Sequence, residues 1–129
     1  SYLSNQYLLS DSLNNCLYVM NKKFNLILKK IDRIKNKRIL NPTNMHIDEN
    51  SKRLFLSCLK HSDFNLSERE ILIISLDLNE ILKIIDYETI TDYFSIENNN
   101  NICFYNNFDN KLTIYNFESD SLINQVNII

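Results

Sequence analysis

Two stretches of this chain carry the same order of apolar and polar positions. Residues 6–21 read QYLLSDSLNNCLYVMN and residues 101–116 read NICFYNNFDNKLTIYN, and their apolar positions match without a gap from Tyr7 and Ile102 onward. In each stretch two short apolar runs flank a polar centre, as in a β-hairpin. Asn and Asp tolerate the left-handed backbone of tight turns. The pattern therefore predicts two hairpins whose turns contain Asn14, Asn15, Asp109 and Asn110.

A third version of the pattern lies between these two. It runs through NMHID, RLFLSCL, ILIISL and EILKIID, with Leu72 within one residue of the place held by Leu17 and Leu112. A longer polar stretch, KHSDFNLSERE, separates its second and third runs. Such self-similarity predicts three units, at about residues 1–36, 37–86 and 87–129, each of up to four short strands.

One of these units resembles a known repeat family. Residues 93–123 are similar to a WD40-type blade, with an outer turn, a hairpin, an alternating strand, a polar turn and a closing strand, and Asp109 matches the family's hairpin-turn aspartate. The place of the family's Trp-Asp pair is held by Tyr115-Asn116, by Met20-Asn21 in the first copy and by Ser75-Leu76 in the middle copy. The chain departs from the family in having no Trp and no Gly. The resemblance implies an all-β fold, a partial β-propeller of about three WD40-like blades.

The number of units raises the question of how the ring closes. Propellers close with about four to eight blades, and this chain supplies about three. We expect it to be part of a longer protein, or to close a ring together with other chains.

Two segments also fit a helix. In residues 22–36 and 67–86 the apolar positions recur at helical spacing, and Ser67 and Glu70 are spaced as a helix-capping box. An α+β domain is therefore the alternative fold. The repeat favours strands, because both segments fall where it requires them.

Composition sets only broad limits on function. The formal net charge is -2, and no apolar run approaches the length of a membrane span. Three widely spaced cysteines, Cys16, Cys58 and Cys103, fit buried thiols better than a disulfide framework. We expect an intracellular protein, in the cytoplasm or nucleus, with no membrane contact.

The sequence offers weak candidates for chemistry. Cys58 and His61 form an isolated C-x-x-H motif, whereas a structural zinc site needs four ligands. No nucleophile can be tied to His46, and a chain without Gly cannot form the usual phosphate-binding loop. We therefore predict a protein that is not an enzyme and that has no metal, cofactor or small-molecule substrate.

The remaining candidates are binding residues. Residues 22–38 hold eight of the fourteen basic side chains, which suggests salt-dependent contact with nucleic acid as an alternative function. The residues chosen for that contact are Lys29, Lys30, Arg33 and Lys35.

The leading hypothesis is a protein-interaction scaffold whose partners are other proteins in a multi-subunit complex. Phe108, at a hairpin tip, is the candidate for an exposed apolar anchor. The loop of the middle unit contributes His61, Phe64, Glu68 and Glu70.

Overall fold

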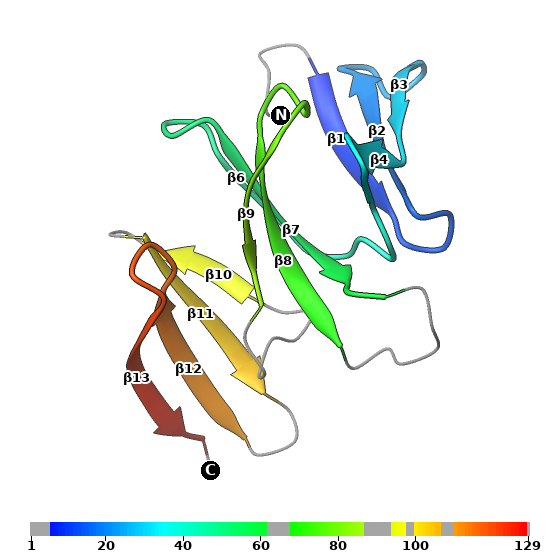
Figure 1. The fold of residues 1–129 in the computed structure, drawn as a ribbon. Helices are drawn as coiled ribbons and strands as arrows, with labels where there is room; N and C mark the ends of the chain where they lie inside the picture. Colours follow the sequence, from blue (N-terminus) through cyan, green and yellow to red (C-terminus); the bar gives the residue numbers. More distant parts are fainter. Residues whose placement is uncertain (1–5, 62–67, 87–93, 98–99, 107–109, 129) are drawn as a thin grey trace.

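The computed structural model describes residues 6–61, 68–86, 94–97, 100–106 and 110–128, which fold into antiparallel β-sheets joined by turns (Figure 1). The first sheet contains β1 (Gln6–Asp11), β2 (Cys16–Asn21) and β3 (Ile27–Ile31). The second contains β6 (Met45–Asp48), β7 (Arg53–Leu59), β8 (Arg69–Ser75) and β9 (Ile81–Ile85). The third contains β10 (Phe94–Glu97), β11 (Asn101–Asn106), β12 (Lys111–Asn116) and β13 (Ser121–Asn127). A small hairpin of β4 (Arg33–Ile34) and β5 (Lys37–Arg38) links the first sheet to the second.

The three large sheets are blades of a partial β-propeller, arranged in chain order from blue through green to red in Figure 1. In each sheet the strands follow one another in sequence order, so each blade is a simple meander. We call the edge formed by β6 and β10 the inner edge, and the edge formed by β3, β9 and β13 the outer edge. The outer strand β13 is exposed along its whole length.

The helical alternative is wrong for the residues that the structure describes. Residues 22–36 contain β3 and β4, and residues 68–86 contain β8 and β9. Ile71 to Ile74 are all buried, which requires apolar contacts on both faces of β8. A central strand between two neighbouring sheets reads as a continuous apolar run, and such a run also satisfies the helical spacing.

The repeat seen in the sequence is reproduced in the strand register. Gln6 pairs with Asn21, and Asn101 pairs with Asn116, so the two hairpins coincide residue for residue. A β-bulge marks the same point in all three blades, after Val19, Ile73 and Ile114.

These bulges align the residues of the middle blade with those of the other two blades, which the sequence could do only to within one residue. The position shared by Leu17 and Leu112 is held by Ile71, one residue before the expected Leu72. By the same shift, Ile74-Ser75 rather than Ser75-Leu76 occupies the place of the Trp-Asp pair. The correction matters because a shift of one residue along a strand moves a side chain to the opposite face.

The second residue of that pair closes the turn between the last two strands of each blade. Asn21 Oδ1 accepts a hydrogen bond from the Leu26 N–H at 3.1 Å, and Ser75 Oγ accepts one from the Glu80 N–H at 3.1 Å. Asn116 Oδ1 accepts one from Ser119 N–H at 2.9 Å in the third blade. A short polar side chain at this position therefore accepts a backbone N–H of the turn in each blade, as an aspartate side chain can do in other turns.

The chain makes its tight turns without glycine. Among the described residues nine have a left-handed backbone, and five of these are Asn or Asp, which tolerate it best. Asn15 (φ 55°) and Asn110 (φ 52°) confirm two of the four predicted turn residues, whereas Asn14 instead donates its N–H to Asp11 Oδ1, and Asp109 lies outside the described residues. Phe24, Lys35, Lys52 and Leu78 take the same conformation with less suitable side chains.

Two apolar cores lie between the blades. The first joins Leu8, Leu17 and Val19 of the first blade to Leu54, Leu56 and Ile74 of the second. The second joins Phe55, Ile71 and Ile73 of the second blade to Ile102 and Phe104 of the third. Alternate residues of β7 and β8 thus serve the two cores, as the side-chain period of a strand requires.

Candidate interaction surfaces

Each blade has two packing faces, and the repeat shows what each face is built to contact. We call the face toward the preceding blade the leading face and the face toward the following blade the trailing face. Leu56 and Phe104 occupy one position on the leading faces of the second and third blades, and both are buried in the cores between blades. Leu9 occupies this position in the first blade, where the described residues include no preceding blade.

The leading face of the first blade is therefore apolar and uncovered by the described residues. Leu9 is 42% exposed, whereas its equivalents Leu56 and Phe104 are 0% and 1% exposed. Tyr7 lies two residues away on the same face, and the Phe24 ring stacks on its ring at a centroid distance of 4.4 Å.

The trailing face of the third blade shows the same pattern at the other end. Val126 pairs with Leu112 as Ile31 pairs with Leu17 and as Ile85 pairs with Ile71. Ile31 and Ile85 are 5% and 1% exposed, whereas Val126 is 45% exposed. The two ends of the arc thus carry side chains of the kind that the internal interfaces bury.

A buried arginine joins the first two blades. Arg69 of β8 donates from Nε to Ser57 Oγ at 3.1 Å, from one terminal nitrogen to Asn41 Oδ1 at 2.8 Å, and from the other to Asn41 O at 2.8 Å. Asn41 in turn donates its N–H to Asn15 Oδ1 at 2.7 Å, in the turn between β1 and β2. The guanidinium therefore fixes the connection that leads from the first blade into β6.

A second arginine, Arg53, joins the second and third blades. The guanidinium carbon of Arg53 lies 5.3 Å from the ring centroid of Phe55 and 5.4 Å from that of Phe117, so the cation lies against two aromatic rings. A terminal nitrogen of Arg53 also lies 3.3 Å from Asp48 Oδ2 and donates to Asn100 Oδ1 at 3.3 Å. Both arginines hold blades together rather than presenting a charge to a partner.

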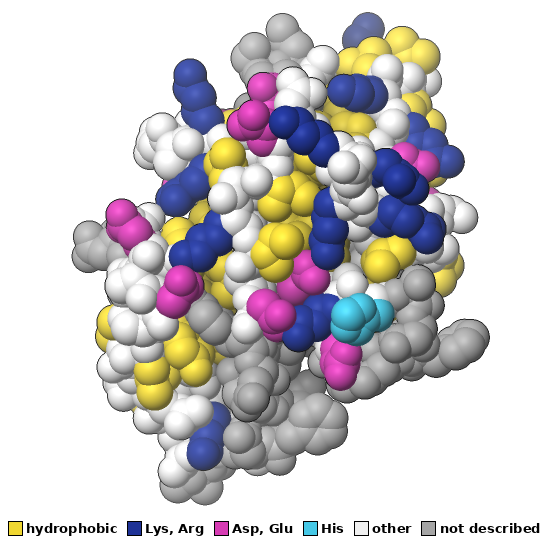
Figure 2. Space-filling model, in the orientation of Figure 1, with side chains coloured by type: hydrophobic (Ala, Val, Ile, Leu, Met, Phe, Trp, Pro, Cys, Tyr) yellow, Lys and Arg dark blue, Asp and Glu magenta, His cyan; other side chains and the backbone are white. Residues whose placement is uncertain are grey.

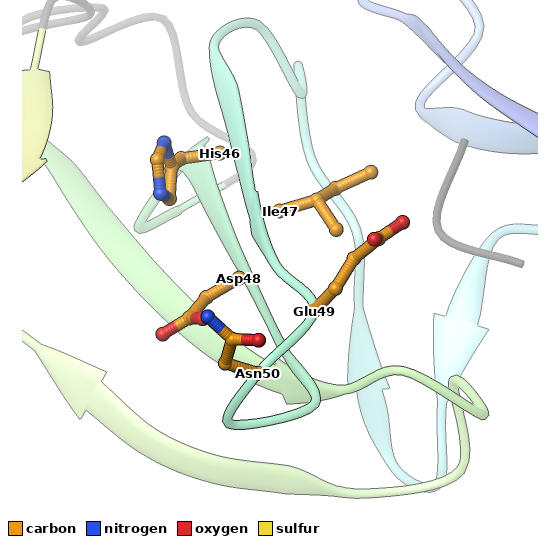
Figure 3. A pocket seen from close by; sticks show the side chains of 5 residues that line it. All are labelled: His46, Ile47, Asp48, Glu49 and Asn50. Carbon is orange, nitrogen blue, oxygen red and sulfur yellow. The ribbon is translucent and has the colours of Figure 1, made fainter.

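A shallow hollow of about 440 Å³ lies beside β6 and the turn that follows it (Figure 3). Its lining comprises His46, Ile47, Asp48, Glu49 and Asn50, with Ile47 and Glu49 on one side of the strand and His46 and Asp48 on the other. A hydrogen bond from Ser51, with smaller help from Arg53, lowers the pKa of Asp48. Its carboxylate thus closes the turn and is already bonded within the chain.

The residues predicted to contact a protein partner fall into three groups. Phe108 and Phe64 lie outside the described residues. His61 and Glu68 are both exposed at the ends of the loop, with His61 Nε2 3.6 Å from Glu68 Oε2. Glu70 does not lie in the loop: it is a residue of β8, is 5% exposed, and forms an ion pair with Lys37 Nζ at 3.0 Å.

The basic side chains of residues 22–38 do not form one strip. Lys29 pairs across from Val19 and Lys30 from Tyr18, so they project from opposite faces of β3. Lys35 is exposed beyond β4, and its Nζ lies 3.8 Å from Glu80 Oε1. Figure 2 accordingly shows dark blue side chains over the upper part of the molecule, interrupted by hydrophobic and acidic ones. Arg33 is exposed as well, but the four candidate residues share no common face.

The candidate metal motif has a buried member. Cys58 lies in the core between the first two blades, and burial raises the pKa of its thiol to about 12. His61 is exposed beyond the end of β7. Within the described ranges no group of three His, Cys, Asp or Glu side chains is arranged to hold a metal ion, and none of the described segments forms a helix able to cross a membrane.

Known structures share this arrangement of blades. No protein-family model matches the chain, and no curated protein matches it in sequence. In three dimensions it is similar to Kuenenia stuttgartiensis hydrazine synthase, with a TM-score of 0.65 and 8% identity over 99% of this chain and 34% of that one. It is also similar to U3-55K (TM-score 0.61, 13% identity) and to the WD40 repeats of RRP9 (TM-score 0.61, 14% identity), each over 96% of this chain and 36% of the other.

These likenesses establish the fold and no more. The chain is a partial β-propeller of the kind found in WD40 repeat proteins, and it spans about a third of the length of these structures. The sequence had indicated the blades but not the two exposed ends. The signal that could have found them is the match of Leu9 with Leu56 and Phe104, once the bulges had aligned the repeats.

Proposed function

We propose that this chain is a non-enzymatic scaffold for protein–protein interaction, acting as part of a β-propeller within a larger protein or complex. The observation that carries the proposal is the exposure of side chains at both ends of the arc. Leu9 and Val126 are 42% and 45% exposed, whereas the equivalent side chains inside the arc are 5% exposed or less. We take both ends to be interfaces for further blades, from the same protein or from a partner.

Physical chemistry supports this use of the two ends. Burying a large aliphatic side chain stabilises an association by about 1.5 to 3 kcal/mol. Leu9 and Val126 lie on strands whose backbone is already ordered, so little conformational entropy is lost when the two end faces are covered. The chain spans about a third of the length of the similar structures, which is consistent with this proposal.

The test is the mass of the chain in solution over a wide range of protein concentration, measured by sedimentation. We expect association that increases with concentration and that Val126→Asp weakens, because a carboxylate on the trailing face cannot be buried unpaired. Leu13→Asp is the matched control, since Leu13 is exposed at the tip of a turn. A monomer at every concentration, with both variants alike, would contradict the proposal.

A second contact is proposed from the sequence. Phe108 lies in the segment that joins β11 to β12, with the loop from His61 to Glu68 as a further candidate. If these segments bind a partner, Phe108→Ala weakens capture of that partner without altering the circular dichroism spectrum. Unchanged capture would remove Phe108 from the interface.

We also propose that the protein acts inside the cell, in the cytoplasm or nucleus. All three cysteines are free thiols, and Cys16 and Cys58 are buried. Free thiols are typical of reducing compartments.

A further inference from the structure

The first blade differs from the other two at its inner edge. In the second blade β6 pairs with β7, and in the third β10 pairs with β11. In the first blade β1 pairs with β2 on one side, and no described strand pairs with its other side. The described part of this blade thus has three strands where its neighbours have four.

The repeat identifies which backbone groups point toward the open side of β1. In β7 the N–H of Ser57 donates to Asn44 O at 3.0 Å, and Ser57 O accepts from the N–H of Thr43 at 3.1 Å, so this residue faces the inner edge. Ser10 occupies the same position in β1. Backbone N–H and C=O groups alternate in direction along a strand. Those of Leu8 therefore point to the open side of β1, as those of Ser10 do, whereas those of Tyr7 and Leu9 point toward β2.

The two inner strands that the chain does contain have the same pattern. β6 reads Met-His-Ile-Asp and β10 reads Phe-Ser-Ile-Glu, so a large apolar residue precedes an isoleucine by two positions. Met45 lies opposite Leu56, and Phe94 lies opposite Phe104. In β1 the position of Leu56 and Phe104 is held by Leu9, whose side chain is exposed.

We infer that the open edge of β1 binds an extended peptide segment as a fourth strand, antiparallel to β1, with Met or Phe opposite Leu9 and Ile opposite Tyr7. The inference deepens the proposed scaffold function, on which it rests, by naming the class of partner. Main-chain hydrogen bonds to Leu8 and Ser10 supply affinity, and the alternate apolar side chains supply specificity. The ladder continues an arrangement that is already present twice in this molecule.

The experiment uses the whole 129-residue chain and a synthetic peptide with the sequence of residues 43–50, TNMHIDEN, labelled for fluorescence anisotropy. We expect saturable binding, weakened at least about tenfold by Leu9→Asp and unchanged by the control Leu13→Asp. A peptide with Asp in place of its Met and Ile should not bind. Binding that is unaffected by Leu9→Asp, or by Asp in place of the peptide's Met and Ile, would overturn the inference.

Hydrogen exchange locates the bound peptide. At saturation we expect slower exchange of the amides of Leu8 and Ser10, with those of Tyr7 and Leu9 unchanged because they already face β2. Slowing along β3 or β13 instead would show addition at an outer edge and would overturn the inference.

Peptide binding and association of the chain, measured separately, distinguish this inference from the proposed function. Val126 lies on the third blade, so Val126→Asp does not alter peptide binding at β1. If the peptide fails to bind while association of the chain still depends on Val126, the strand-binding inference fails and the scaffold proposal stands.

Discussion

Replacing Arg69 by Met tests how the first two blades are held together. The change keeps an unbranched side chain of similar length in a site where Arg69 is buried, and it removes the charged donors from Ser57, Asn41 and Thr43. Ser57 is fully buried, so its Oγ loses its charged donor without access to water. Asn41 and Thr43 are half-buried and can turn to solvent, so the loss at these two is smaller.

The expected cost is about 3 kcal/mol in the free energy of unfolding, because hydrogen bonds to a charged group are worth about 1.5 to 3 kcal/mol each and only part of this is recovered from water. The assay is urea unfolding at neutral pH, with the exposed Arg38→Met as control. Arg69→Lys should restore only part of the loss, since an ammonium cannot reproduce the planar fork.

A second readout distinguishes this network from simple loss of packing. Asn41 donates its N–H to Asn15 and its side-chain amide to Ser12 O at 3.2 Å, so disturbing it should speed amide exchange in the turn between β1 and β2. If Arg69→Met costs less than about 1 kcal/mol and leaves that exchange unchanged, the reasoning about the junction is wrong.

Three further predictions concern turns and a thiol. Lys52 is exposed with φ 56°, so Lys52→Gly should raise the free energy of unfolding by about 1 kcal/mol, whereas Lys52→Ala should not, as thermal unfolding would show. Asp48→Asn should destabilise the protein at neutral pH, and its difference from wild type should shrink as the pH falls below about 4. The reason is that a lowered pKa in the folded state gives stability above the unfolded-state pKa, and this stability is lost as the pH falls through the folded-state pKa; a difference from wild type that stays the same at every pH would contradict this. Cys58, with a pKa raised to about 12, should resist alkylation at pH 8 in the folded chain while the half-buried Cys103 reacts first, and equal rates would contradict its placement in the core.

Much of the fold could be predicted from the sequence because hairpins are local. The stretches 6–21 and 101–116 repeat without a gap, and their paired strands share one register. The middle blade was placed only to within one residue, because the bulge after Ile73 leaves no trace in an unbroken run of isoleucine and leucine.

The candidate sites were harder to predict because they depend on contacts between blades. Glu70 reads as a loop carboxylate in sequence, yet Lys37, from a segment 33 residues earlier, lies beside it at a buried position. The roles of Arg53 and Arg69 likewise depend on rings and carbonyls from other strands. The exposure of Leu9 and Val126 could not be predicted from residue type, because apolar side chains at the equivalent positions are buried in the neighbouring blades.

We propose above all that both ends of this arc are blade interfaces. The measurement that tests it most directly is an experimental structure of the protein in its assembled state, whether that assembly is a longer chain or a complex. We predict a β-sheet packed about 10 Å from each end face, with Leu9 and Val126 buried beneath it. End faces that remain in solvent in the assembled state, or that are covered by something other than a sheet, would contradict it.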